Sequence, residues 1–235
     1  MENVTFLMET INITQRENGG YSHKKLEAWD IAGADTKIED AYAPCTVRVL
    51  SILPYETTGF ANTVFFGSCD EKGNQCPVRL GNKKESVLTF ALTHSNDISD
   101  IKVGKIYKSG EPFYKEGTTG NATGNHIHVE VGEGWQTKKY KRSDGIWEIT
   151  GCIPINGVFY FLEGWNKVKN LNGVSLPVVK YRSAIFSIVD AQKAFQIVAG
   201  KRKATGSDLQ FLDINGDGVI DLSDVMKIFK IVAGD

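Results

Sequence analysis

The segment Gly117–Glu130, GTTGNATGNHIHVE, places two of the chain's four histidines one residue apart at the start of an expected strand. Because side chains alternate along a strand, His126, His128 and Glu130 share one face, and the residues between them are apolar. Two imidazoles on one strand face are suited to a metal site, and the glycine-rich turn before them lets a substrate approach. For a His-x-His pair taken alone, a purely structural role is the more common alternative.

The pattern around this segment predicts a mainly β fold. From residue 41 to about 162, short runs rich in Val, Ile, Phe and Tyr alternate with Gly, Asn and Asp, which is typical of antiparallel sheets. After residue 181 the apolar spacing becomes helical. We therefore expect an antiparallel-sheet domain at 1–168, a linker at 169–180 and a small all-α domain at 181–235. The expected strands include Thr46–Leu50, Thr63–Phe66, Ser86–Thr93 and His126–Val131.

Composition excludes several classes of protein. In 235 residues, 41% are hydrophobic and 23% charged, and the net charge of -1 gives no reason to expect a nucleic-acid partner. The longest apolar run, at 158–162, is far shorter than the roughly 20 residues of a membrane span. The first 20 residues lack the basic-then-apolar order of a secretory signal. Of the four cysteines, Cys69 and Cys76 flank an expected hairpin tip, so a disulfide there is the alternative to free thiols.

His23 and Asp30 add to the His-x-His pair. Two neutral imidazoles and one carboxylate form a three-ligand zinc set that leaves a fourth position for water. Taken singly, His23 is more simply explained as a surface loop residue and Asp30 as a turn or helix cap. The assembled pattern, rather than any one residue, therefore carries the indication of a metal site.

Five short motifs between about residues 15 and 135 occur in the order found in a known family. They are His23 with Ala28–Ala32, Tyr42–Pro44, Leu92–His94, Ile101–Lys105 and Gly117–Glu130. Together they resemble the lysostaphin-like zinc peptidases of peptidoglycan, family M23. One departure is that six residues separate His23 from Asp30, whereas the most familiar spacing in the family is three.

The resemblance implies roles for all four histidines. His23, Asp30 and His128 would bind one catalytic zinc ion, and His94 and His126 would be the catalytic pair. Glu130, on the same strand face, would orient a histidine, with a plain surface glutamate as the alternative. The implied activity is a zinc metallo-endopeptidase that hydrolyses peptide bonds in bacterial peptidoglycan.

The same resemblance implies a place of action. An enzyme of this kind without a signal peptide is expected to be made in the cytoplasm. It would reach the cell wall after release, as a phage endolysin, or as a component of a virion. The basic run at 137–142 is either a solvated loop or a contact for anionic wall polymers.

Residues 181–235 contain an internal repeat with a period of 34. Asp190–Gly200 and Asp224–Gly234 are identical at seven of eleven positions, which indicates two copies of one helical unit. The segment Asp213–Asp224 also fits a twelve-residue calcium loop, with Gly218 at the sharp turn. Because the first copy keeps only Ser187 and Asp190 as polar residues at the ligand positions, we expect one calcium ion per chain. Its expected ligands are Asp213, Asn215, Asp217, the backbone carbonyl of Val219, Asp221 and Asp224.

This repeat resembles a dockerin domain, an EF-hand-like module that docks onto cohesins, although its first loop is missing. The module would bind a wall polymer or a protein partner, or serve as a structural anchor. Two alternatives to the enzyme stay open at this point. One is a non-catalytic, peptidase-like adaptor that binds the wall, and the other is a component docked through a cohesin.

Overall fold

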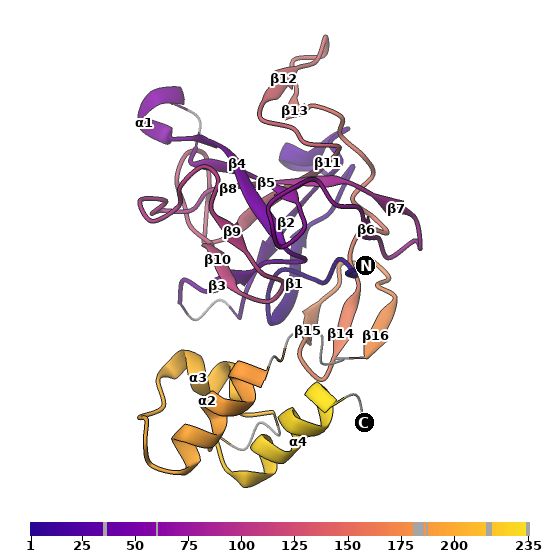
Figure 1. Ribbon diagram of the computed structural model, residues 1–235. Coiled ribbons are helices and arrows are strands. Elements are labelled where there is room, and N and C mark those ends of the chain that lie inside the picture. Colours follow the sequence, from indigo (N-terminus) through magenta and orange to yellow (C-terminus); the bar gives the residue numbers. More distant parts are fainter. Residues whose placement is uncertain (35–36, 60, 181–185, 187, 215–217, 234–235) are drawn as a thin grey trace. The chain divides into compact units, whose positions relative to one another are not determined.

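The computed structural model describes residues 1–235 except 35–36, 60, 181–185, 187, 215–217 and 234–235 (Figure 1). The chain divides into two compact units, Met1–Lys180 and Tyr181–Asp235, which we call the sheet unit and the helical unit. No helix among the described residues combines the length and the apolar character needed to cross a membrane.

An eight-stranded sheet forms the centre of the sheet unit (Figure 1). All neighbouring strands in it are antiparallel except the edge pair β1 and β15, which is parallel. The fold of this unit is therefore mainly β and dominated by antiparallel pairs. From one edge to the other, the strands are β15 (Lys167–Asn170), β1 (Thr10–Gln15), β2 (Ala28–Ala32), β11 (Ile127–Glu133), β8 (Leu88–Thr93), β5 (Thr63–Ser68), β4 (Val47–Leu53) and β9 (Ile106–Tyr107).

Four two-stranded ribbons and two short helices surround this sheet. The segment expected as a linker, 169–180, contains the end of β15 and the whole of β16, because each of these strands pairs with an earlier strand of the sheet unit. The ribbons are β3 (Asp40–Tyr42) with β10 (Pro112–Lys115), β6 (Val78–Arg79) with β7 (Glu85–Ser86), β12 (Lys139–Lys141) with β13 (Trp147–Ile149), and β14 (Phe161–Glu163) with β16 (Val178–Lys180); the helices are η1 (Tyr21–His23) and α1 (Tyr55–Thr58).

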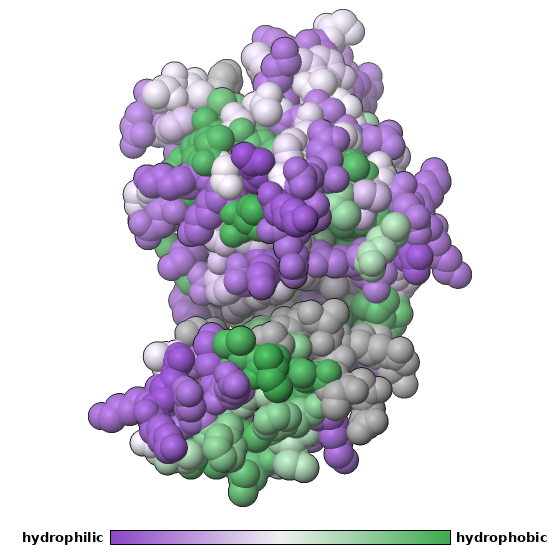
Figure 2. Space-filling view, in the orientation of Figure 1, coloured by the Kyte–Doolittle hydropathy of each residue, from purple (hydrophilic) through white to green (hydrophobic). Residues whose placement is uncertain are grey.

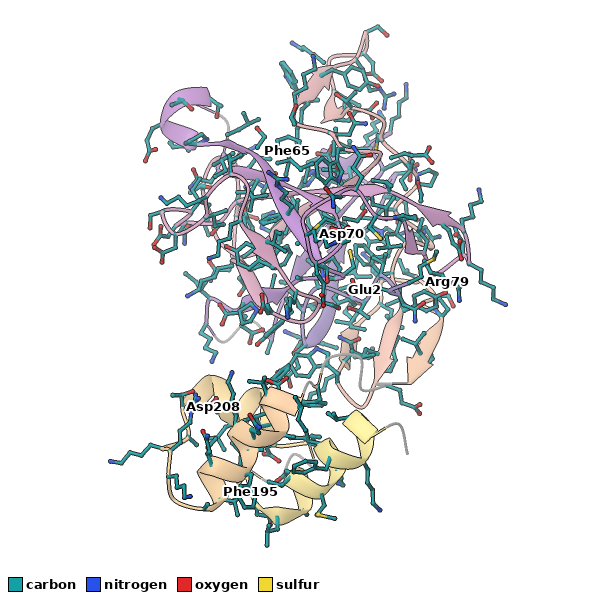
Figure 3. The ribbon with its side chains drawn as sticks, in the orientation of Figure 1. Glu2, Phe65, Asp70, Arg79, Phe195 and Asp208 are labelled. Carbon is teal, nitrogen blue, oxygen red and sulfur yellow. The ribbon has the colours of Figure 1, made fainter. Side chains whose placement is uncertain are left out.

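The central strands carry apolar side chains on both faces. Every residue of β2, β5 and β8 is buried, which agrees with their continuous apolar runs. On one face Phe66 packs against Phe113 with ring centroids 4.5 Å apart, and Phe90 and Trp29 pack against Phe159. The other face holds a smaller cluster built around Phe65, which is labelled in Figure 3. A sheet packed on both sides gives a rigid support for residues at its strand ends.

The helical unit contains α2 (Ile188–Val198), α3 (Gly206–Leu212) and α4 (Leu222–Ala233). Helices α2 and α4 cover the two segments with helical periodicity, and they contact each other around a small apolar core. Exposed apolar side chains are also frequent here, and Figure 2 shows hydrophobic residues gathered on the visible face of this unit.

Helix α3 was not expected from the apolar spacing because it spans only seven residues. Its start is fixed by a capping box, in which Thr205 Oγ1 accepts from the Asp208 N–H and Asp208 Oδ2 accepts from the Thr205 N–H. Figure 3 labels Asp208 in this first turn.

All four cysteines are free thiols in this structure, so no disulfide crosses the hairpin tip between Cys69 and Cys76. Burial raises the pKa of the Cys69 thiol to about 11 and that of the Cys152 thiol to about 12. Both thiols are therefore protonated at neutral pH, and the sheet unit is held together by packing rather than by covalent cross-links.

The fully buried ring of Phe66 offers a test of the core. Phe66→Ala removes packing against Phe113 and leaves a cavity, so we expect the free energy of unfolding to fall by about 3–5 kcal/mol. Val103→Ala, at a position that is 64% exposed, should change it by less than about 0.5 kcal/mol. Urea unfolding followed by circular dichroism measures both, and equal effects would contradict this account of the core.

Candidate metal centre and groove

The register of three adjacent strands brings distant residues together. In β11, His128 lies opposite Asp30 of β2 on one side and opposite Thr93 of β8 on the other. His94 follows Thr93 directly at the end of β8, and His23 arrives from η1. The site is therefore assembled at the ends of central strands, where the backbone is fixed on both sides by sheet hydrogen bonds.

Three side-chain atoms converge within this arrangement. Nε2 of His23 lies 3.1 Å from Oδ1 of Asp30, and Nδ1 of His128 lies 3.0 Å from the same oxygen. The two imidazole nitrogens are 3.2 Å apart. Ligand atoms about 2.0–2.1 Å from one tetrahedral zinc ion lie roughly 3.3 Å from each other, so the spacing of the three atoms fits such an ion.

The hydrogen bonds on the far side of each ring determine which nitrogen carries the proton. Nδ1 of His23 lies 3.2 Å from the Arg16 carbonyl, and Nε2 of His128 lies 2.9 Å from Oε1 of Glu130. Both of these nitrogens must donate to their oxygen acceptors. When a ring is neutral, as metal binding requires, its other nitrogen presents a lone pair toward the Asp30 carboxylate. Two lone pairs and one anion facing a common point form a site for a cation, and this donor set is suited to zinc.

Glu130 contacts the candidate ligand His128 at Nε2, the ring nitrogen that does not face Asp30. Its side chain is fully buried, and Oε1 also lies 2.5 Å from Nζ of Lys139, while Oε2 accepts from the Ile149 N–H. Burial alone would raise the pKa of this carboxyl, but the Lys139 ammonium and the His128 hydrogen bond lower it to about 2. Glu130 is therefore an ionised acceptor, which keeps the His128 proton on Nε2.

His94 and His126 lie beside the three candidate metal ligands. Their ring centroids are 4.5 Å apart, and Nε2 of His126 is 3.8 Å from Oδ1 of Asp30. In each ring Nδ1 faces a backbone carbonyl, that of Thr119 for His94 and that of Gly124 for His126, so Nε2 stays available to accept a proton. These carbonyls belong to the glycine-rich turn, which thereby orients both rings.

His94 has an unusual backbone and a shifted pKa. Its φ of 91° lies in the left-handed region, and hydrogen bonds from its N–H to the Asn62 carbonyl and from the Thr119 N–H to its own carbonyl hold it there. Burial lowers the pKa of its imidazole to about 4, outweighing the hydrogen bond to Thr119 that raises it. His94 is thus neutral at pH 7.

A cavity of about 600 Å³ opens onto this cluster. All four histidines, Asp30 and Glu130 line it, so the structure brings every residue that the sequence assigned to the zinc site and its chemistry into one place. The six residues between His23 and Asp30 are accommodated by a turn in which Lys25 has a φ of 62°. Within the described part of the chain, only His23, Asp30 and His128 bring three ligand atoms within 4.8 Å of one another.

The expected calcium loop lies in the helical unit. Gly218 has the left-handed φ of 88° that the turn requires, and its N–H donates to Oδ2 of Asp213. Asp224 is buried, and its two oxygens accept from the N–H groups of Ile214 and Asp221. Val219 is described, whereas Asn215 and Asp217 lie outside the described residues. Calcium binding at this loop therefore stays a prediction.

The sequence reading missed the β12–β13 hairpin as part of the site. Lys138, Lys139 and Trp147 line the cavity, and Lys139 pairs with the buried Glu130. The only signal was the basic run at 137–142, for which a solvated loop was the simpler explanation. The proximity of the hairpin to the candidate zinc ligands depends on how it folds back on β11, which local sequence does not determine.

Comparison with known proteins gives distant similarities. No family model matches the chain. It is 29% identical over 167 residues to Morphogenesis protein 1 of Bacillus phage B103, a match that covers 66% of this chain and 42% of that protein. The chain thus spans less than half of the length of this curated relative.

The chain also resembles solved structures, among them those of two bacterial peptidases. A zinc-containing peptidase from Vibrio cholerae matches with a TM-score of 0.39 and 21% identity, covering 56% of this chain and 36% of the other. A putative M23 peptidase from Pseudomonas aeruginosa matches with a TM-score of 0.36 and 23% identity, covering 57% of this chain and 47% of the other.

The three converging ligand atoms predict a defined zinc stoichiometry. We expect the full chain, dialysed against zinc, to hold one zinc ion by elemental analysis. His128→Ala removes the ligand nitrogen nearest Asp30 and should lower zinc affinity at least about tenfold. His94→Ala, which removes a ring outside the ligand set, should keep the stoichiometry at one. Loss of zinc from both variants alike would contradict the ligand assignment.

Proposed function

We propose that the sheet unit is a zinc-dependent endopeptidase that hydrolyses peptide bonds in bacterial peptidoglycan. The observation that carries this proposal is the convergence of Nε2 of His23, Oδ1 of Asp30 and Nδ1 of His128, 3.0–3.2 Å from one another, on the lining of a cavity. Two further histidines with available nitrogens lie beside that point. A protein that only binds the cell wall needs no metal ligands. Three metal-binding side chains next to a histidine that can accept a proton are instead suited to hydrolysis.

The chain's own residues divide the chemistry as follows. A zinc ion, when bound, supplies Lewis acidity toward the carbonyl of the scissile peptide. His126 accepts the proton of the attacking water on Nε2 and returns it to the leaving amine. His94, whose lowered pKa makes it a weak base at neutral pH, packs against the His126 ring and keeps its orientation. Glu130 and the Arg16 carbonyl hold the ligand histidines in the metal-binding tautomer.

The substitution His126→Gln tests the proposed base. It keeps a polar side chain near the ligands but removes the proton acceptor, so hydrolysis should fall at least about 100-fold while one zinc ion is retained. Turbidity loss of purified bacterial walls and mass spectrometry of the released peptides measure activity and identify the bond. A zinc-free sample with calcium restored should be inactive.

Other outcomes would overturn the proposed activity. Full wall lysis by the zinc-free sample would show that hydrolysis does not depend on the metal. Wall binding without hydrolysis by the zinc-loaded wild type, on walls of several species, would instead support the non-catalytic adaptor. The similarity to a phage protein supports a further part of the proposal, that the enzyme is made in a host cytoplasm and acts as an endolysin or in a virion.

We also propose that the helical unit binds one calcium ion through the loop 213–224 and serves as an anchor or spacer. The left-handed Gly218 and the loop-facing carboxylates of Asp213 and Asp224 support this proposal. A cohesin, another protein or a wall polymer would be its partner.

Calorimetric titration of the zinc-loaded full chain with calcium should show one site. Asp221→Asn removes one charged ligand and should weaken calcium binding by about tenfold. The matched control is Asp190→Asn, because Asp190 occupies the position of Asp224 in the repeat copy without a calcium loop. Two sites of similar affinity, or an equal effect of both variants, would count against this assignment.

A further inference from the structure

The β12–β13 hairpin forms one wall of the cavity above the metal centre. Lys138, Lys139 and Trp147 line the cavity from this hairpin, on the same space that the four histidines face. The remaining lining includes uncharged residues such as Thr58, Ala61 and Thr123. The cavity therefore has one wall with cationic and aromatic groups, and its lining outside the metal cluster is otherwise largely neutral.

This hairpin is held in place at both ends. At its base, Glu130 binds the Lys139 ammonium of one strand and the Ile149 N–H of the other. Farther along, Arg142 donates to the Lys25 carbonyl, 2.9 Å away, next to the turn that carries His23. The wall is thus fixed to the same elements that position the metal ligands, which makes it a defined surface for a substrate.

Some charged side chains of the hairpin form ion pairs, whereas Lys138 does not among the described residues. Its two acidic residues, Asp144 and Glu148, both pair with Arg142, and Lys139 pairs with Glu130. Among the ion pairs between described residues, none involves Lys138, whose side chain is exposed. The ammonium group of Lys138 is therefore available to an incoming anion.

The carboxylates that line the cavity, Asp30 and Glu130, face positively charged or hydrogen-bonding partners, which reduces their repulsion of an incoming anion. Asp30 faces the rings of His23 and His128, and Glu130 is fully buried beneath Lys139. Trp147 is 43% exposed and adds an apolar surface on the same wall. Lys138 and Trp147 together can hold a carboxylate and the aliphatic stem that carries it.

We propose that this wall is a subsite for a free carboxylate of the peptide substrate, so that the protein prefers acidic peptides to their amidated forms. The inference rests on the proposed endopeptidase function and names its substrate class. Because Lys138 lines the same cavity as the metal ligands, the anion belongs to the molecule that is cut rather than to a polymer bound elsewhere. Lys138 contacts the carboxylate, and Trp147 packs against the adjacent side chain.

A matched pair of ligands tests the subsite. A synthetic peptidoglycan stem peptide is prepared with its free carboxylates and with the same groups converted to amides. Binding of each to zinc-loaded His126→Gln protein is measured by calorimetry, and hydrolysis of each by zinc-loaded wild type is measured as kcat/KM. We expect the acidic peptide to bind about fivefold more tightly, with a preference that declines as salt rises.

Two substitutions separate the subsite from overall charge. Lys138→Gln, in either background, should reduce the acid-to-amide ratio to about one. Lys84→Gln removes the same charge at an exposed position outside the cavity lining and should leave the ratio unchanged. The proposed subsite requires that the preference for the acidic peptide over its amide depends on Lys138 itself.

The outcomes for the subsite and for the enzyme are distinguishable. Equal binding of both peptides, no binding of either, or a preference that survives Lys138→Gln would overturn the subsite. Preferential binding of the acidic peptide without any hydrolysis would support the subsite and overturn the endopeptidase. Hydrolysis of both peptides with equal kcat/KM would leave the endopeptidase standing and overturn the subsite.

Discussion

The hydrogen bond from Nε2 of His128 to the buried carboxylate of Glu130 is the contact on which the rest of the site depends. It fixes the proton on one side of the ring and therefore presents the lone pair of Nδ1 on the other. Without that orientation, His128 would offer an N–H rather than a ligand atom to the point where His23 and Asp30 meet. Burial makes the contact effective, because a fully buried carboxylate must keep all of its hydrogen-bond partners.

Glu130 also connects the candidate metal centre to the wall of the cavity. The same carboxylate accepts from Lys139 and from the Ile149 backbone, so one side chain joins the candidate ligand His128 of β11 to both strands of the β12–β13 hairpin. The positions of the proposed reacting groups and of the groups that line the cavity are thus set by one network. A displaced hairpin would disturb His128, and a displaced His128 would leave buried polar groups unpaired.

Much of the fold follows from local patterns. The buried strands β5 and β8 have short continuous apolar runs, and α2 and α4 have apolar residues at helical spacing. The spacing of the apolar residues and the length of each run therefore identify these elements. The short helix α3 and the two-stranded ribbons lack such periodicity, because a capping box or a single cross-strand pair determines them. Segment 169–180 reads as a linker, yet β16 forms there because it pairs with the distant β14.

The sequence by itself supplied the candidate zinc ligands, through side-chain chemistry, the alternation along the His126–Glu130 strand, and an order of motifs that resembles family M23. Only the tertiary structure decided that Asp30 lies opposite His128, that His94 follows an adjacent strand, and that Lys138 and Trp147 line the same cavity. The physical reason is that strand register and hairpin packing depend on contacts between segments far apart in the chain. No local pattern specifies which partners those segments choose.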